Sequence, residues 1–301
     1  MTAKPRPDQH SMSPLAWGLL LLLAMIWGSS FLSNRAALDG LGVFTTVTIR
    51  VTGGAALLWL WVVLRKIRLP RSPARIWQFL LIGFFANALP FSLIVWGQQH
   101  ISSGLASILN ASAAIFGVLI AALVFVDERM TTRKASGVAL GFAGVVLAIG
   151  AEALGTLDLR ALGQWAIIGS SLSYGIGAAL ARKMTKGLPH EVSAAGALTG
   201  AAAWMIPLML WREGVPDFDW PAHSWAGVIW LAFACSALAY LLYFRVMELA
   251  GMANLSLVGL LIPPFAIVAG ALAYDERLGL NQLAGFAVIA LGLLILRERK
   301  A

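Results

Sequence analysis

The chain has few charged residues, and this scarcity excludes most soluble folds. Only 12% of its 301 residues are Asp, Glu, Lys or Arg, whereas 59% are apolar. An ordinary soluble domain holds about 25% charged and about 45–50% apolar residues. So few charges cannot cover the surface of a water-soluble fold of this length. The composition therefore predicts an all-α membrane protein with no room for a sizeable soluble domain.

Residue types that carry catalytic or metal chemistry are also scarce. A single cysteine, Cys235, excludes an internal disulfide framework and a cysteine-rich metal site. The four histidines are scattered, and the chain has no zinc-protease, P-loop or nucleophile-elbow motif. We therefore predict that the protein is not an enzyme and needs no cofactor or metal. The excess of 22 Lys and Arg over 14 Asp and Glu is typical of cytoplasmic loops and does not require a nucleic-acid partner.

Ten apolar stretches are each predicted to form a membrane helix. The fifth and tenth are short, at about 16 and 15 residues, and span only a thinned region or pack against neighbours. The stretches cover residues 15–34, 43–64, 76–98, 105–126, 135–150, 163–181, 192–211, 225–246, 253–274 and 282–296.

The distribution of Lys and Arg predicts the orientation. With a cytoplasmic N-terminus, that side holds 17 of the 22 basic residues and the other side four, with Arg50 inside the second stretch. Basic loops resist translocation. We therefore predict a multi-pass protein of the plasma (inner) membrane with both termini in the cytoplasm.

The chain also matches itself at a displacement of about 148 residues. This repeat predicts two five-helix units, 1–150 and 151–301, of opposite orientation because five is an odd number. Inverted repeats around a central cavity are typical of secondary transporters. The matching pairs are Asp127-Glu128-Arg129 with Asp275-Glu276-Arg277, Gly137 with Gly285, Gly144 with Gly292, Trp27-Gly28 with Tyr174-Gly175 and Arg35 with Arg182.

Several motifs resemble the EamA type of the drug/metabolite transporter superfamily, including its aromatic amino acid exporter branch. They are Trp27-Gly28-Ser29-Ser30, Arg50 in TIRVTGG, ILNASAAIFG at 108–117 and the two Asp-Glu-Arg triplets, each followed by glycines. The resemblance covers nearly the whole chain and implies a ten-helix metabolite carrier, often an exporter. It implies a cavity lined by helices 1, 3, 4, 6, 8 and 9, with helices 5 and 10 peripheral.

One departure from the family pattern concerns proline. The family usually has a proline in its fourth helix, where this chain has Ala113-Ala114, and the second half keeps Pro263-Pro264. The resemblance therefore predicts a proline break in the ninth stretch, while the fourth lacks the proline for one.

Polar and aromatic residues inside the apolar stretches are the candidate substrate-binding residues, because polar atoms in hydrocarbon must face protein or water. Small residues and serines also mediate helix packing, which is the alternative for each. The candidates are Trp27, Ser30, Asn34, Arg50, Asn87, Pro90, Trp96, Asn110, Ser112, Tyr174, Tyr240, Tyr243, Pro263 and Pro264.

Arg50 and His100 keep alternative interpretations. Arg50 snorkels to the interface, forms a structural ion pair or binds a substrate carboxylate. His100 is an interfacial residue or a proton carrier. We interpret the Asp-Glu-Arg triplets as structural charges at helix ends, and the glycines of 137–144 as a close-packing face.

No Asp, Glu or Lys lies in the middle of a predicted helix. Proton-coupled carriers commonly place a titratable carboxylate there. We therefore expect alternating access without an obligatory intramembrane carboxylate, which is consistent with facilitated export.

The expected substrates are amino acids, aromatic or apolar ones included. The alternatives are drug-like organic cations, sugar or nucleotide derivatives, or a channel, and the sequence leaves the choice of monomer or homodimer open.

Overall fold

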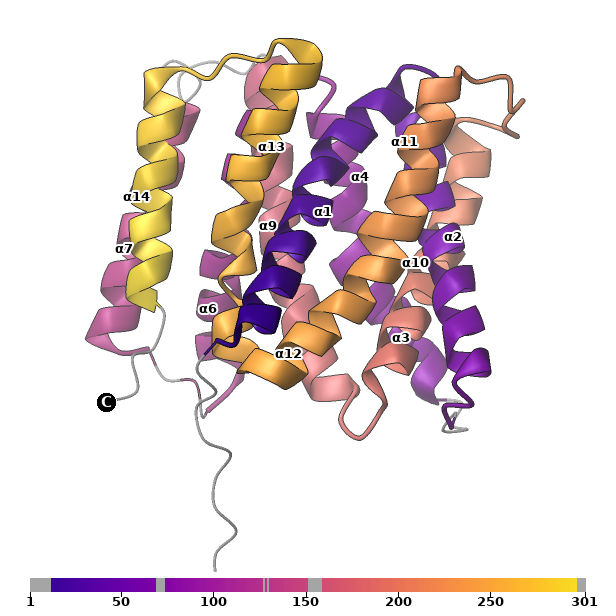
Figure 1. The fold of residues 1–301 in the computed structure, drawn as a ribbon, viewed down its shortest axis with the longest axis horizontal. Helices are drawn as coiled ribbons and strands as arrows, with labels where there is room; N and C mark the ends of the chain where they lie inside the picture. Colours follow the sequence, from indigo (N-terminus) through magenta and orange to yellow (C-terminus); the bar gives the residue numbers. More distant parts are fainter. Residues whose placement is uncertain (1–11, 69–73, 127, 129, 151–158, 297–301) are drawn as a thin grey trace, which may run out of the picture.

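A computed structural model describes residues 12–68, 74–126, 128, 130–150 and 159–296, and every regular element in these ranges is helical. Two short segments, η1 and η2, have the wider π-helical hydrogen bonding. In chain order (Figure 1) the elements are α1 (Pro14–Leu38), α2 (Val43–Leu64), α3 (Ala74–Gly83), η1 (Phe84–Ala88), α4 (Leu89–Gly97), α5 (Ser103–Asn110), α6 (Ala113–Val124), α7 (Thr132–Ile149), α9 (Leu159–Met184), α10 (His190–Arg212), α11 (Ala222–Ala232), η2 (Phe233–Leu238), α12 (Ala239–Leu255), α13 (Val258–Tyr274) and α14 (Leu280–Leu296).

Length and apolar composition identify most of these helices as membrane-spanning; we call each continuous or interrupted helix that runs from one face of the molecule to the other a rod. Seven helical runs in the described residues are long and apolar enough to cross a bilayer, and α13 and α14 are shorter apolar helices. Helix α9 has 26 residues, a length of about 39 Å at 1.5 Å per residue. The prediction of a multi-pass, all-helical membrane protein is confirmed.

The rods run up and down, so that α1 begins and α14 ends on the same side (Figure 1). We call this side the basic face, because α2 ends, α3 and α7 begin and α9 ends there with Lys and Arg. The first rod of the second half, α9, runs opposite to α1 (Figure 1). The described residues of the basic face include Arg65, Lys66, Arg68, Arg75, Arg133, Lys134, Arg182, Lys183 and Lys186.

Two helix interruptions differ from the sequence prediction. The fourth stretch is broken at Ala111 and Ser112 without a proline. There the Ser112 hydroxyl donates to the Leu109 carbonyl at 2.6 Å, a local bond that competes with the helical ladder. A continuous fourth helix is therefore the wrong expectation.

The expected proline break in the ninth stretch is also wrong. Helix α13 runs through Pro263 and Pro264, and the interruption lies before it, at residues 256 and 257. The two prolines lie in the second turn of α13 and have no N–H to donate to the carbonyls four residues earlier. Those carbonyls belong to Gly259 and Leu260, which lie in the first turn. Membrane helices tolerate proline where freed carbonyls find other partners.

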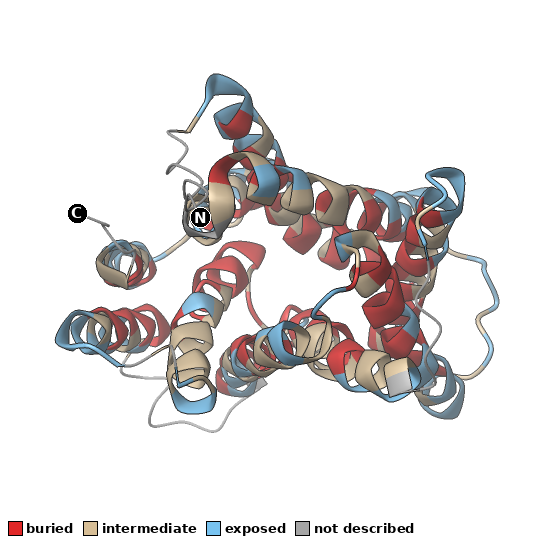
Figure 2. Cartoon of the chain, turned by 90° about the horizontal axis from the view of Figure 1, so that it is seen from below, coloured by how far each residue is buried: buried red, intermediate tan, exposed pale blue. Residues whose placement is uncertain are grey.

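Many helix contacts between the two halves of the chain have an equivalent contact in which the halves are exchanged. Helix α1 packs on α13 and on the interrupted helix α11–η2–α12, as its counterpart α9 packs on α6 and on the interrupted helix α3–η1–α4. Helices α2 and α10 pack on each other across the two halves, and so do α7 and α14. This pattern fits a pair of related five-rod units. Figure 2 shows α7 and α14 at one edge, as the resemblance implied for helices 5 and 10.

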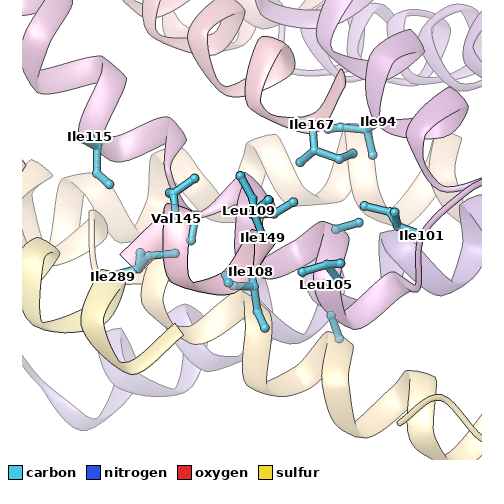
Figure 3. Packing of buried hydrophobic residues seen from close by; sticks show 14 of the residues in the cluster. Ile94, Ile101, Leu105, Ile108, Leu109, Ile115, Val145, Ile149, Ile167 and Ile289 are labelled. Atoms are coloured by element: carbon cyan, nitrogen blue, oxygen red, sulfur yellow. The ribbon is translucent and has the colours of Figure 1, made fainter. Parts of the chain in front are cut away.

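Packing replaces the hydrophobic effect as the force that holds such helices together, because lipid is as apolar as leucine. One buried cluster joins α4, α5, α6, α7, α9 and α14 through interdigitated side chains such as Ile108, Ile115 and Ile289 (Figure 3). Helices α7 and α14 approach still more closely, through glycines. A Cβ at Gly144 would lie 2.6 Å from the Ile289 amide nitrogen, and one at Gly285 would lie 2.5 Å from that of Ala148. The predicted close-packing face on the fifth helix is confirmed.

The close approach of α7 and α14 makes a stability prediction. Gly144→Ala should lower the unfolding temperature in detergent, because the added methyl forces the helices apart at a cost of about 1–3 kcal/mol. Gly117→Ala in α6 is the matched control, since no heavy atom lies within 4 Å of its added Cβ. Thermal unfolding followed by tryptophan fluorescence measures both. Equal unfolding temperatures for the two variants would contradict the observed packing.

Candidate functional site

The guanidinium of Arg50 is a positive charge enclosed by helices. Arg50 is 5% exposed, and its Cζ lies 3.7 Å from the centre of the Phe91 ring. Its Nε donates to the Ser236 hydroxyl at 3.3 Å. None of the ion pairs among the described residues includes Arg50. Arg50 therefore neither snorkels to the interface nor forms a structural ion pair, and its charge lacks a counter-ion.

Two π-helical segments flank this charge, one from each half of the chain. Segment η1 interrupts the α3–α4 rod and carries Asn87, and η2 interrupts the α11–α12 rod and carries Cys235 and Ser236. Such segments are rare and often occur at functional sites. Pro90 follows η1, but η2 has no proline, so proline alone does not explain the pair. The equivalent places of the two segments in the two halves point to a shared role.

Asn87 is fully buried and only half satisfied. Its Oδ1 accepts a hydrogen bond from the Tyr240 hydroxyl at 3.0 Å, whereas its Nδ2 has no partner in the described part of the chain. A buried donor without an acceptor costs about 1–3 kcal/mol. The free amide group of Asn87 is therefore available to an acceptor on a solute.

Four predicted aromatic residues surround the same region. Tyr174 packs edge-on against Phe91 with 6.3 Å between ring centres, and Phe91 in turn contacts the Arg50 guanidinium. Tyr240 lies one helical turn after Ser236 and bonds to Asn87. Tyr243 lies 5.9 Å from the Trp27 ring, and the Trp27 indole donates to the Cys235 carbonyl at 3.1 Å. The structure thus brings Trp27, Arg50, Asn87, Tyr174, Tyr240 and Tyr243 together from both halves. We call these six residues the central cluster.

Sequence reasoning missed four neighbours of the central cluster. The Phe91 ring packs against the guanidinium of Arg50, and the Ser236 hydroxyl accepts a hydrogen bond from Arg50 Nε. The Cys235 carbonyl accepts a hydrogen bond from the Trp27 indole. The Phe244 ring stacks on the Tyr240 ring with 6.2 Å between their centres. The self-match of the chain was the available signal, because it aligns the segment around Asn87 with the segment around Cys235 and Ser236.

Two other predicted residues lie nearer the face opposite the basic face. Asn34 donates to Gln98 at 2.8 Å, and Gln98 in turn donates to the Phe31 carbonyl at 2.9 Å. Trp96 stacks edge-on against His100 at 4.8 Å. Gln98 and His100 line an open hollow of about 690 Å³ together with Arg35, Asp39, Arg160 and Arg277, among others. Asn34 and Trp96 therefore contact residues of this hollow and lie outside the central cluster.

The remaining predicted residues serve helix geometry or lie apart. Ser30 donates to the Trp27 carbonyl of its own helix, and Pro90 is buried just after η1. Asn110 and Ser112 flank the break between α5 and α6, where the Asn110 Oδ1 has no partner among the described residues. Pro263 is buried in α13, whereas Pro264 is exposed.

The central cluster combines a cation with no carboxylate partner among the described residues, the partnerless amide of Asn87, tyrosine hydroxyls and aromatic rings. Such a set suits a small solute that has an anionic oxygen group and an apolar or aromatic body. In the described residues no group of three His, Cys, Asp or Glu side chains could hold a metal ion. The chemistry available is recognition by charge, hydrogen bonds and ring contact.

The contact between Arg50 and Ser236 makes a prediction that needs no ligand. Ser236→Ala should destabilise the protein by about 1.5–3 kcal/mol, because it removes the acceptor of a buried charged group. Ser33→Ala is the control, since the Ser33 hydroxyl bonds only to the Ser29 carbonyl of its own helix. Thermal unfolding in detergent compares the two variants, and a Ser236→Ala protein as stable as Ser33→Ala would refute the contact.

Comparisons with known proteins agree with this architecture. The EamA-like transporter family model matches residues 15–150 and 161–297. A probable terminal-alkyne amino-acid exporter of Streptantibioticus cattleyicolor is 26% identical, over 96% of this chain and 95% of its own. The protein PagO of Salmonella typhimurium is 24% identical, over 92% and 91%.

A solved crystal structure shares the fold with a TM-score of 0.67 at 17% identity, covering 96% of this chain and 98% of its own. The family match extends over both halves of the chain and includes the central cluster, both π-helical segments and the α7–α14 contact. The chain therefore belongs to the EamA-like transporter family.

Proposed function

We propose that this membrane transporter is an alternating-access carrier that exports small organic metabolites, most notably amino acids with apolar or aromatic side chains. In this proposal the ten predicted spans form two inverted units, 1–150 and 151–301, around the central cluster. The family membership and the paired helix contacts support the carrier class over a channel.

The uncompensated charge of Arg50 is the observation that carries the substrate class. A buried guanidinium without a carboxylate is costly in a membrane interior, and a bound carboxylate would supply the missing counter-ion. Asn87 Nδ2 offers a second donor in the central cluster, since it has no partner among the described residues. Trp27, Tyr174 and Tyr243 would contact the side chain of an amino acid.

The same charge disfavours the alternative substrates. An organic cation would be repelled by Arg50 at low dielectric, even though aromatic rings alone would attract it. A nucleotide or sugar phosphate carries more negative charge than one buried arginine compensates. The similarity to a probable amino-acid exporter supports the amino-acid assignment.

The orientation and coupling are part of the proposal. The Lys and Arg of the basic face support a cytoplasmic location of that face, with both termini on the cytoplasmic side of the inner membrane. We infer facilitated export without proton coupling, because no intramembrane carboxylate is available in the sequence. Transport in proteoliposomes that disappears without a pH gradient would refute this coupling, and His100 would be the first candidate carrier of the proton.

A counterflow experiment tests the substrate class. Proteoliposomes containing the protein and unlabelled phenylalanine should accumulate labelled phenylalanine in a saturable manner. Unlabelled leucine and tryptophan should compete, whereas phenethylamine, which lacks only the carboxylate, should not. Nucleosides and quaternary amines complete the panel. Competition by the amines without competition by the amino acids would favour the organic-cation alternative.

Two variants of Arg50 should separate the effect of its charge on transport from the effect of its shape. Arg50→Met is expected to reduce amino-acid transport by about 30-fold or more, since removal of one partner of a buried charge pair costs about 2–5 kcal/mol. Arg50→Lys should keep part of the activity, because it retains the charge but loses the flat contact with Phe91. Counterflow rates at equal reconstitution measure both variants. Full activity of Arg50→Met would remove Arg50 from the binding site.

A further inference from the structure

Two inter-helix ion pairs occupy equivalent places in the two halves of the chain. On the face opposite the basic face, Arg35 at the end of α1 donates to Glu276 at 2.6 Å. On the basic face, Arg182 near the end of α9 donates to Glu128 at 3.1 Å. Arg35 and Arg182 match each other in the self-alignment of the chain, and so do Glu276 and Glu128. Each pair joins one half of the chain to the other.

The surroundings of the two arginines repeat as well. The guanidinium of Arg35 lies 4.4 Å from the centre of the Tyr274 ring, and that of Arg182 lies 4.2 Å from the centre of the Phe125 ring. Each ring belongs to the end of a rod that leads into an Asp-Glu-Arg triplet. Two unrelated surface ion pairs would not share both the charged partners and the ring. The glutamates of the two triplets therefore each connect the two halves of the chain.

The Arg35–Glu276 pair, on the face opposite the basic face, is more enclosed than the Arg182–Glu128 pair. The Glu276 side chain is 6% exposed and also accepts from the backbone amides of Ser103 at 3.0 Å and Gly104 at 3.1 Å. One carboxylate thus holds the ends of α1 and α13 and the start of α5 together. Arg35 also lines the 690 Å³ hollow, and Trp27 of the central cluster lies eight residues earlier on the same helix.

The pair on the basic face is more open. The Glu128 side chain is 36% exposed and accepts from Lys134 at 2.9 Å in addition to Arg182. The hydrogen bond from Lys134 holds the pKa of Glu128 below its ordinary value, so the carboxyl is ionised near neutral pH. The repeat equivalents of Ser103 and Gly104 fall at residues 251 and 252, and Gly251 has left-handed backbone with φ of 76°. The two ends of the molecule are therefore in unequal states.

We propose that Arg35–Glu276 and Arg182–Glu128 are the two alternating gates of the carrier, one on each face of the membrane. Breaking one pair frees the rod ends on that face, and the inverted repeat converts the same movement into closure at the other face. In this structure the Glu276 gate is closed, and the Glu128 gate is the weaker of the two. This inference rests on the proposed alternating-access function.

Side-specific labelling of one cysteine tests the gates without any transport measurement. The reporter is Asn110→Cys in a Cys235→Ser background, because Asn110 lies at the break between α5 and α6, inside the bundle. A membrane-impermeant thiol reagent is added to right-side-out and to inside-out vesicles. Glu276→Gln should raise the labelling rate from the face of Arg35 about threefold or more and lower it from the basic face. Glu128→Gln should do the reverse.

Partner variants and a matched control protect the test against misfolding. Arg35→Gln should reproduce the effect of Glu276→Gln, and Arg182→Gln that of Glu128→Gln. Glu248→Gln is the control, since its ion pair with Arg245 lies within one helix, α12, and should leave both rates unchanged. The proposal is overturned if Glu276→Gln and Glu128→Gln shift labelling in the same direction, or change it no more than Glu248→Gln. Failure of amino-acid counterflow alone would overturn the substrate proposal and leave this result intact.

Discussion

A cation enclosed among membrane helices must be compensated by the groups around it, and the arrangement around Arg50 follows from this constraint. The Phe91 ring and the Ser236 hydroxyl lower the cost of the charge, but neither of them carries a negative charge. Arg50 belongs to α2, and these two partners come from α4 and η2, so both halves of the chain meet at one place. Under the proposed function, a solute with an anionic group would complete this site and would couple binding to the packing of the two halves.

Much of the fold follows from hydropathy and charge. The ten apolar stretches correspond to the rods of the structure with ends that differ by a few residues, since α1 continues to Leu38 and α9 begins at Leu159. The side on which α1 begins and α14 ends is the side richest in Lys and Arg (Figure 1). These features are local, because burial in lipid acts on each stretch by itself.

The features that sequence reasoning did not find depend on contacts between distant residues. The break at Ala111 and Ser112 depends on one serine bond, and the helix through Pro263 and Pro264 depends on where α13 begins. The π-helical segments have no signature that a single sequence reveals. The Arg50 alternatives could not be decided without Phe91 and Ser236, and the triplet glutamates needed Arg35 and Arg182, far away in the chain.

The contact between α7 and α14 has a mechanical consequence. Glycines bring these two helices to backbone contact along their length, and each helix is the last rod of its half. Neither contributes to the central cluster, and both lie at the edge of the bundle (Figure 2). Backbone contact resists separation of these two helices, so in the proposed alternating access this pair would stay together while the other helices of the two halves tilt. In that proposal the distance from the pair to Arg50 determines how far a small rotation moves the central cluster.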